Sequence, residues 1–426
     1  MVRCFIMALI VLFFLIHLSS AEPLLYDEVL TRPEQIHLSL TGSNSEMMVT
    51  WVTRNSTGMP MVEYGLAGGI KRSGQQMQNE LGWPKFDQVA VGETDTFIDG
   101  GSLHRRLYIH RVKMTGLKPK QEYVYHVGGA LGWSDVYFFM TYPDGTTWSP
   151  RIVLFGDMGN ENAQSLSRLQ EETQRGFYDA IFHVGDFAYD MNTDNAHVGD
   201  EFMNQIQSIA AYVPYMTCVG NHEGAYNFSN YKNRFTMPGG DGEGMYFRKP
   251  VCLRTELKGH GLSRCVTVQC TAQTAMILNT APTCKTLYIR TGVNLEHSFS
   301  AEQLLYKYGV DLHIQAHEHS YERMWPVYNL TVCNGSKSEP YRNPRAPVHI
   351  VTGSAGCKEK LDPFFRFHTE WSAFHRDDYG YTRINIINGT HLYLEQVSDD
   401  EKGAVIDKMT LIKEHHGSYD CHLGKK

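Results

Sequence analysis

Apolar and polar positions alternate along much of the chain between residues 33 and 142. The alternation is clearest in Ile36–Leu40, Met47–Thr53 and Tyr123–Val127, and turn-forming Asn, Gly and Pro residues separate these runs. A period of two places every second side chain on the same side of a strand, so this region is predicted to be an all-β sandwich. No cluster of titratable side chains accompanies the runs. We therefore expect an accessory domain rather than a carbohydrate-binding or partner-binding module.

The pattern changes after the turn cluster Tyr142–Gly145, which predicts a domain boundary. From Arg151 onward, short apolar runs alternate with segments whose apolar side chains fall on one face of a helix, such as 163–175 and 200–211. Strands that alternate with helices are typical of an α/β domain around a central sheet. The predicted domains are 22–145 and 146–412, followed by a tail at 413–426.

Two features of the first domain resemble a known sandwich. Trp51 and the run Leu117–Tyr123 are similar to the core tryptophan and the tyrosine corner of a fibronectin type III domain. The predicted fold is therefore a fibronectin type III-like sandwich followed by an α/β domain.

The stretch Phe247–Ser298 shows neither period and contains four of the cysteines. Regularity returns downstream in a predicted helix, a strand and a hairpin that turns at Asn388-Gly389: 301–306, 347–352, and 381–387 with 390–397.

The N-terminus carries a different signal. Arg3 precedes the apolar run Phe5–Leu18, and the small residues Ser19-Ser20-Ala21 follow it. This order predicts a secretory signal peptide, residues 1–21, that is removed. The alternative is an uncleaved anchor, but the run is shorter than the ~20 residues that a spanning helix needs. We expect no membrane span after cleavage.

Cysteines and glycosylation sequons agree with a secretory route. Of nine cysteines, Cys4 lies in the predicted signal, so eight remain, and an even number predicts disulfides whose pairing the sequence does not give. Five N-x-[ST] sequons predict glycosylation at Asn55, Asn227, Asn329, Asn334 and Asn388. We expect a glycosylated protein that is secreted or lysosomal. The formal net charge of -7 gives no support to a nucleic-acid partner.

Four short runs carry polar donors directly after apolar, strand-like segments: Gly156–Gly159, Gly185–Tyr189, Gly220–Glu223 and Ala316–His319. In an open α/β sheet, ligands bind beyond the carboxyl ends of the strands, so four such runs can converge on one site. The donors are Asp157, Asp186, Tyr189, Asn221, His317 and His319. This mixture of oxygen and nitrogen donors suits hard or borderline metal ions, and we expect two of them.

Two adjacent metal ions need an anionic ligand that bridges them. Asp186 is the candidate bridge, because a carboxylate has two oxygens and its strand lies in the middle of the ligand-bearing order. Asp157 and Asn221 would each serve one ion. His317 and His319 are two positions apart, and we expect an extended segment that points both side chains the same way, one toward each ion.

Tyr189 carries the most information about the metal. Zinc and magnesium compete poorly with protons for a phenolate, whereas iron(III) is acidic enough to hold one. Each run alone is ordinary, because an Asp after Gly at a strand end is usually a turn or cap residue. His183, His313 and His349 lie on strands without a motif and are predicted to be structural. The fourfold recurrence of strand, small residue and donor favours a metal centre.

These runs resemble the motifs of the purple acid phosphatases, and most closely those of their animal type 7 group. The matching motifs are Gly-Asp-x-Gly at Asp157, Gly-Asp-x-x-Tyr at Asp186, Gly-Asn-His-Glu at Asn221 and Ala-His-Glu-His-x-Tyr-Glu-Arg at His317. The resemblance covers about 33–246 and 304–411. It implies a metallophosphoesterase domain with a central β-sandwich flanked by helices, and an acid phosphatase that hydrolyses small phosphate monoesters.

The resemblance also implies roles at the site. Its two ligand sets share one carboxylate: Asp157, Asp186, Tyr189 and His319 for iron(III), and Asp186, Asn221 and His317 for a divalent iron or zinc. It implies a metal-bound hydroxide as the nucleophile. His222 is the predicted catalytic residue, either as a hydrogen-bond donor to the phosphate or as an orienting partner of Asp186.

One ligand of that family is missing from its expected position. The family carries a His in Gly-His-x-Pro between the third and last runs, whereas Gly259-His260-Gly261 lacks the Pro and follows no apolar strand. We interpret Phe247–Ser298 as an alternative exon or a reading-frame error; a genuine stretch would leave the activity low or absent. Two other functions stay open: a phosphodiesterase or nucleotidase with two divalent ions, and a secreted, non-catalytic binding relative. The sequence does not give the oligomeric state.

Overall fold

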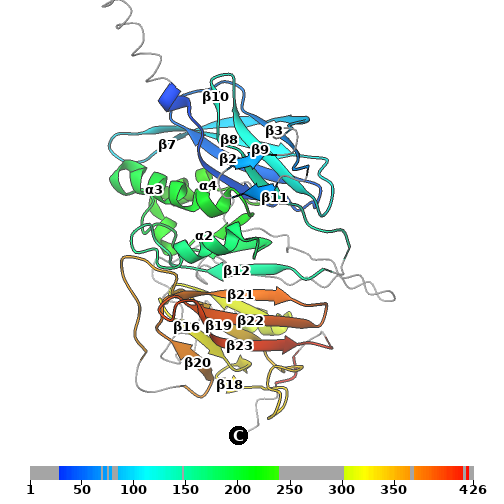
Figure 1. Ribbon diagram of the computed structural model, residues 1–426. Coiled ribbons are helices and arrows are strands. Elements are labelled where there is room, and N and C mark those ends of the chain that lie inside the picture. The colour runs from blue at the N-terminus through cyan, green and yellow to red at the C-terminus, as the bar shows by residue number, and fades with distance from the viewer. Residues whose placement is uncertain are drawn as a thin grey trace, which may run out of the picture.

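The computed structural model describes residues 28–68, 71–73, 76–78, 85–145, 148–238, 302–364, 369–415 and 419–421. The predicted signal peptide, the stretch 247–298 and His260 lie outside the described residues. The described part consists of two β-rich units, and the helices α3 and α4 lie between them (Figure 1). The chain enters the second unit through β12 and returns to the same sheet at its end.

The N-terminal unit is a sandwich of two antiparallel sheets. One has the order β1-β2-β8-β7 and the other β10-β9-β3-β6, with β11 paired to β9. The strands are β1 Glu34–Ser39, β2 Met47–Thr53, β3 Met61–Leu66, β6 Gln88–Val91, β7 Glu93–Ile98, β8 Arg106–Met114, β9 Glu122–Gly129, β10 Gly132–Trp133 and β11 Tyr137–Met140. Two short strands, β4 Lys71–Ser73 and β5 Gln76–Gln78, form a separate hairpin.

The sandwich is held by the two features that suggested it. Trp51 is buried and stacks on His110, with ring centroids 5.1 Å apart. The hydroxyl of Tyr123 accepts a hydrogen bond from the backbone N–H of Lys118 at 2.9 Å, which is the contact of a tyrosine corner. The predicted all-β sandwich is confirmed.

The described part of the second unit contains two larger sheets and a small two-stranded sheet, β17-β18. In the larger, of order β14-β13-β12-β21-β22-β23, the first three strands are parallel and the others antiparallel. The smaller has the order β15-β19-β16-β20. The strands are β12 Arg151–Phe155, β13 Ala180–Val184, β14 Tyr215–Cys218, β15 Leu312–Gln315, β16 Tyr321–Met324, β17 Val327–Tyr328, β18 Thr331–Val332, β19 Val348–Thr352, β20 Ser372–Arg376, β21 Gly380–Ile386, β22 His391–Ser398 and β23 Ala404–Ile412.

The helices confirm the predicted alternation of strand and helix. They are α2 Leu166–Gln174, α3 Thr193–Ala210, the 3-10 turn η1 Asn221–Glu223, α4 Ala225–Arg234 and α5 Glu302–Lys307. The regular part of α3 follows three left-handed residues, Asp194, Asn195 and Ala196, and so begins a few residues before the predicted 200–211. The predicted hairpin is the β21–β22 pair.

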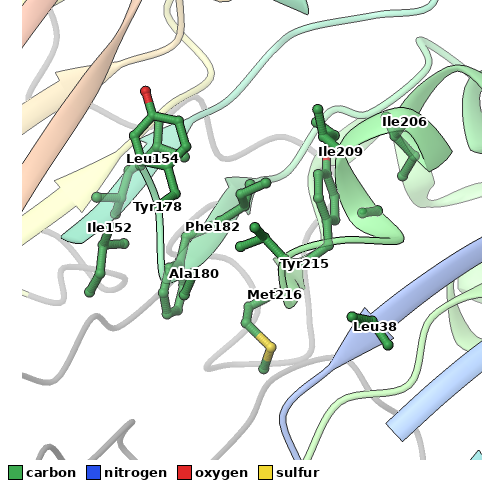
Figure 2. Close-up of a cluster of buried hydrophobic side chains, with 14 of the residues drawn as sticks. Leu38, Ile152, Leu154, Tyr178, Ala180, Phe182, Ile206, Ile209, Tyr215 and Met216 are labelled. Carbon is green, nitrogen blue, oxygen red and sulfur yellow. The ribbon is translucent and has the colours of Figure 1, made fainter. Parts of the chain in front are cut away.

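One hydrophobic core runs through both units. Leu38 of β1, Ile209 of α3, Phe182 of β13 and Met216 of β14 all belong to it (Figure 2). Polar contacts join the same surfaces, since the hydroxyl of Tyr125 donates to the carbonyl of Ala211 at 2.6 Å. The described residues contain no helix that is long and apolar enough to cross a membrane.

Candidate metal centre

Three predicted donors from distant parts of the chain lie in mutual contact. Asp157 follows β12, Tyr189 follows β13 and His319 follows β15. The hydroxyl of Tyr189 donates to Oδ1 of Asp157 at 3.1 Å and lies 2.7 Å from Nε2 of His319. Nε2 of His319 is 3.5 Å from Oδ1 of Asp157. All three side chains are buried.

Asp186 forms a second group beside the first. Its Oδ2 lies 3.7 Å from Nδ1 of His317, and its Oδ1 accepts the backbone N–H of His222 at 2.9 Å. Asn221 follows β14, begins η1 and is exposed. The structure therefore places His319 with Asp157 and His317 with Asp186.

The prediction that His317 and His319 share an extended segment is wrong. β15 ends at Gln315, and the chain then bends, with a φ of 79° at His317. The parallel partner β19 pairs with β15 only as far as Gln315, so no ladder extends the strand into the histidine run. The bend, rather than strand alternation, directs the two imidazoles to different carboxylates.

The donors share an unusual backbone conformation. Asp157, Asp186, Tyr189 and His317 have positive φ values of 57°, 52°, 55° and 79°. Left-handed residues other than glycine cost free energy and persist where the surroundings enforce them, which is common at functional sites. The segments that follow β12, β13 and β15 are therefore shaped to aim these four side chains.

Two glycines leave room for the carboxylates. A Cβ atom at Gly220 would lie 2.1 Å from Oδ1 of Asp186, and one at Gly353 would lie 2.7 Å from Oδ2 of Asp157. No other residue type fits either position without displacing a carboxylate. Gly220 stands in one of the four runs, and Gly353 directly follows β19.

Electrostatics favour a positive charge within the cluster. Burial raises the pKa of Asp157 to about 6, and the like charge of Asp186 adds to the shift. Burial opposes the ionised forms of Asp186 and His319, but their partners outweigh it: His317 and the His222 amide lower the pKa of Asp186, and Asp157 raises that of His319 to about 12. These shifts keep a proton near the carboxylates, because two buried bare carboxylates repel each other.

Burial also raises the pKa of Tyr189 well above its ordinary value, with Asp157 adding to the effect. A phenolate at this position therefore requires a neighbouring cation of high charge. Among the described residues, the ion pairs of Asp157 and Asp186 come from histidine alone. The donor chemistry thus fits metal ions, which would neutralise buried anions that no Lys or Arg in the described chain pairs with.

In the described parts of the chain, no three His, Cys, Asp or Glu side chains are arranged to hold a metal ion. Tyr189 and Asn221, two of the six predicted donors, are of other residue types. The fit therefore rests on the kinds of donor and on their pairing.

Several supporting residues escaped the sequence reading. The buried carboxylate of Glu223 accepts three backbone N–H groups, from Asp186 at 3.0 Å, Phe187 at 2.9 Å and Gly220 at 2.6 Å. It ties the second and third runs together. Glu223 is the last residue of the run Gly-Asn-His-Glu, so the sequence contained a signal for it, although no role was predicted.

The segment after β19 also supports the cluster. The carbonyl of Lys360 lies 2.8 Å from Nδ1 of His319. If Nδ1 carries the proton, Nε2 is left as the donor atom toward Tyr189 and Asp157. The buried thiol of Cys357 lies 3.4 Å from the same Nδ1. No motif in the sequence pointed to this segment.

His222 lies at the edge of the cluster. Its contact with Asp186 comes from the backbone N–H, whereas its Nδ1 lies 3.0 Å from Oδ1 of Asp190. Its ring packs on Tyr189, with centroids 4.4 Å apart. The side chain of His222, which is only partly buried, therefore does not orient Asp186. Its role as a hydrogen-bond donor to the phosphate stays a prediction.

The remaining predicted residues lie away from the cluster. His183, His313 and His349 are buried in the sheets. None of the five predicted sequon asparagines is buried: Asn55, Asn227, Asn329, Asn334 and Asn388. A disulfide joins Cys333 to Cys421, and Cys218 and Cys357 are buried.

Known proteins share this architecture. Three family descriptions match the chain: "Purple acid Phosphatase, N-terminal domain" over 33–141, "Calcineurin-like phosphoesterase" over 150–321, and "Iron/zinc purple acid phosphatase-like protein C" over 346–408. Acid phosphatase type 7 from Danio rerio is 47% identical over 91% of this chain and 93% of that protein. The Homo sapiens protein of the same name is 43% identical over 89% of this chain and 91% of its own length.

A solved structure agrees in fold. The purple acid phosphatase PPD1 from yellow lupin (Lupinus luteus) seeds superimposes with a TM-score of 0.68 over 90% of this chain and 75% of that one. Its sequence identity is 22%, so the likeness concerns the fold alone.

Proposed function

This chain belongs to the purple acid phosphatase family, and on that basis we propose that it hydrolyses small phosphate monoesters at acid pH with a dinuclear metal centre. Members of this family are metallophosphoesterases with acid phosphatase activity, and the fold of this chain agrees with that family. The single observation that carries the metal assignment is the buried contact of Tyr189 with Asp157 and His319.

The proposed ligand sets are those implied by the motifs that the chain shares with the purple acid phosphatases. An iron(III) would be held by the buried triad with Asp186: Asp157, Asp186, Tyr189 and His319. A divalent iron or zinc would be held by the second group: Asp186, Asn221 and His317. Support comes from the pairing of His319 with Asp157 and of His317 with Asp186, which divides the histidines between the two sets.

When bound, such ions supply an acidified water and positive charge for the phosphate oxygens. The chain itself supplies orientation. Glu223 fixes the backbone of Asp186 and Gly220, and Lys360 fixes the ring of His319 through its Nδ1. Each contact limits the freedom of a ligand before substrate arrives, which is the role of groups behind the ligands in metal sites.

His222 is proposed as the donor to the phosphate ester. Asp190 holds its Nδ1 at 3.0 Å, which leaves Nε2 to face outward, 3.9 Å from the half-exposed Glu359. An imidazole between two carboxylates can carry a proton to a phosphate oxygen or to the leaving group. The ring of Tyr189 packs against the ring of His222 and limits its movement.

We also propose a secretory or lysosomal location. The support is the predicted signal peptide, the five sequons, none of whose asparagines is buried, and the Cys333–Cys421 disulfide, which is typical of oxidising compartments. Digestion of the expressed protein with an N-glycosidase would lower its apparent mass, and an unchanged mass would contradict glycosylation.

The test of the function is direct. The full-length protein, purified from a secreting host, is assayed with an aryl phosphate between pH 4 and 8 while its iron and zinc contents and visible absorption are measured. We expect turnover greatest at acid pH, about two metal ions per chain and a tyrosinate band. A metal-poor, inactive protein with a cooperative thermal transition would instead favour the non-catalytic binding relative. Activity with divalent ions and no visible band would favour the phosphodiesterase or nucleotidase.

A further inference from the structure

A loop of the N-terminal sandwich reaches into the second unit. This 99–105 loop connects β7 to β8. Leu103 N–H and the Ser102 hydroxyl both donate to Oδ1 of Asn195, at 3.0 and 3.2 Å, and Arg105 donates to the carbonyl of Asn195 at 2.8 Å. The loop therefore caps the first turn of α3.

The same loop also contacts the start of α4. Gly100 packs against the ring of Tyr226 so closely that a Cβ at Gly100 would lie 2.5 Å from its Cγ. Oδ1 of the buried Asp99 accepts a hydrogen bond from Asn230 at 3.3 Å. Two separate segments of the second unit thus meet on one loop of the first.

Both segments have left-handed backbones. Asp194, Asn195 and Ala196 have φ values of 50°, 52° and 64°, and Tyr226, Asn227 and Phe228 have values of 50°, 57° and 61°. Three consecutive left-handed residues are costly, and such turns persist where neighbouring structure enforces them. The 99–105 loop supplies contacts to both turns.

An ion-pair cluster fixes the loop in place. Arg105 pairs with Asp200 at 2.5 Å, and Arg234 of α4 pairs with the same carboxylate at 2.9 Å and donates to the carbonyl of Ala196 at 3.2 Å. Asp200 and Arg234 are buried, so the loss of either partner would leave an uncompensated charge.

Each turn follows a run of the metal centre. The carbonyl of Asp190, next to Tyr189, accepts the N–H of Thr193 at 2.9 Å, directly before the first turn. The carboxylate of Asp190 holds Nδ1 of His222. The second turn begins four residues after His222, and Gly224 lies between them. A shift of either turn would therefore move Asp190 or His222.

We propose that the 99–105 loop is a positioning element for the phosphatase site: by holding both left-handed turns, it keeps Asp190 and His222 aligned over Tyr189. This proposal rests on the proposed role of His222. It gives the N-terminal sandwich a function in turnover beyond packing.

The test compares two variants of the full-length protein, one that introduces a steric clash and one that removes it. Gly100→Ala places a methyl group against Tyr226, and the double variant Gly100→Ala/Tyr226→Gly removes the ring while glycine accepts the left-handed backbone. We expect Gly100→Ala to speed hydrogen–deuterium exchange in 190–199 and 224–230 and to lower kcat about tenfold with KM nearly unchanged, as for residues that orient ligands. The double variant should restore both.

Tyr125→Phe is the matched control, because it removes an interface hydrogen bond at the other end of α3. A loss of turnover equal to that of Gly100→Ala would show general destabilisation and overturn the proposal, as would faster exchange confined to 97–106. If the unsubstituted protein lacks phosphatase activity, the proposed function fails, and the exchange pattern alone still decides whether the loop holds the two turns.

Discussion

The phenol of Tyr189 lies 2.7 Å from Nε2 of His319, although 130 positions separate the two residues. Tyr189 follows a central parallel strand of the larger sheet, and His319 follows an edge strand of the smaller one. The contact therefore forms only where the ends of the two packed sheets meet. It also joins the phenol, the candidate donor that best distinguishes iron(III) from zinc or magnesium, to an imidazole, which suits both iron and zinc.

Tyr189→Phe tests this contact. The substitution removes the phenol and leaves the ring that packs on His222, so we expect loss of the visible band, reduced iron content and a fall in kcat of about 100-fold or more. Absorption spectroscopy and metal analysis of the purified variant provide the measurement. Tyr64→Phe, which removes a hydroxyl bonded to the carbonyl of Thr115 in the sandwich, is the control. A band that survives in Tyr189→Phe would exclude this tyrosine as the ligand.

Gly220→Ala tests the space around Asp186. The added methyl group would lie 2.1 Å from Oδ1 of Asp186, so the carboxylate must move and both ligand sets lose their shared member. We expect the metal content to fall by at least half and turnover to fall with it. Gly176→Ala is the control, because its Cβ would meet nothing within 4 Å and only its left-handed φ of 72° is penalised, by about 1 kcal/mol. Equal metal loss in both variants would contradict the steric explanation.

Glu223→Gln tests the connection between the second and third runs. The two carboxylate oxygens of Glu223 accept three backbone N–H groups. A glutamine has only one acceptor oxygen, and its NH₂ group would face at least one of those N–H groups. We expect the free energy of unfolding to fall by about 1–3 kcal/mol, the usual penalty of buried donors left without acceptors. Denaturant titration at neutral pH measures it. The partly exposed Glu63 serves as the control, and a Glu63→Gln effect of the same size would argue against the role of Glu223.

His349→Gln tests the dependence of stability on pH. His313 and His349 are buried with their Nδ1 atoms 3.1 Å apart, and burial lowers their pKa values to about 4 and about 3. The unfolded chain binds protons below pH ~6.5, whereas these folded residues do not until about pH 4, so stability falls as the pH drops through this window. Each such histidine contributes a slope of about 1.4 kcal/mol per pH unit.

Between pH 6 and 4.5 the free energy of unfolding should therefore fall less steeply in His349→Gln than in the unsubstituted protein. The difference in slope should be about that of one histidine. Unfolding free energies from denaturant titrations across that range provide the measurement. An unchanged slope in His349→Gln would mean that His349 titrates alike in the folded and unfolded chains.

The sequence predicted elements better than it predicted their ends. The period of two located β2 at the observed residues, Met47–Thr53, and the turn at Asn388-Gly389 located the β21–β22 hairpin. The same reasoning placed His317 on an extended segment, where the chain bends. Periodicity reports which side chains are buried along a regular element, and it carries no information about backbone angles after the element stops.

Sequence patterns were enough to nominate the candidate donors, but they did not identify the residues that hold those donors in place. Asp157, Asp186 and Tyr189 stand in short runs after apolar strands, so order along the chain is enough to nominate them. Glu223 and Lys360 act through a buried carboxylate and a backbone carbonyl. Such contacts depend on which loops meet, which no local pattern records.

The sequence by itself determined the all-β and α/β units and the family and nominated the candidate donors, because strand patterns and motifs are local properties of the chain. Only the tertiary structure decided that His319 pairs with Asp157 and His317 with Asp186, and that a sandwich loop reaches the turns behind His222. The physical reason is that these relationships are made between residues tens to hundreds of positions apart. Packing of the two sheets and the sandwich, rather than any local preference, sets the distances between them.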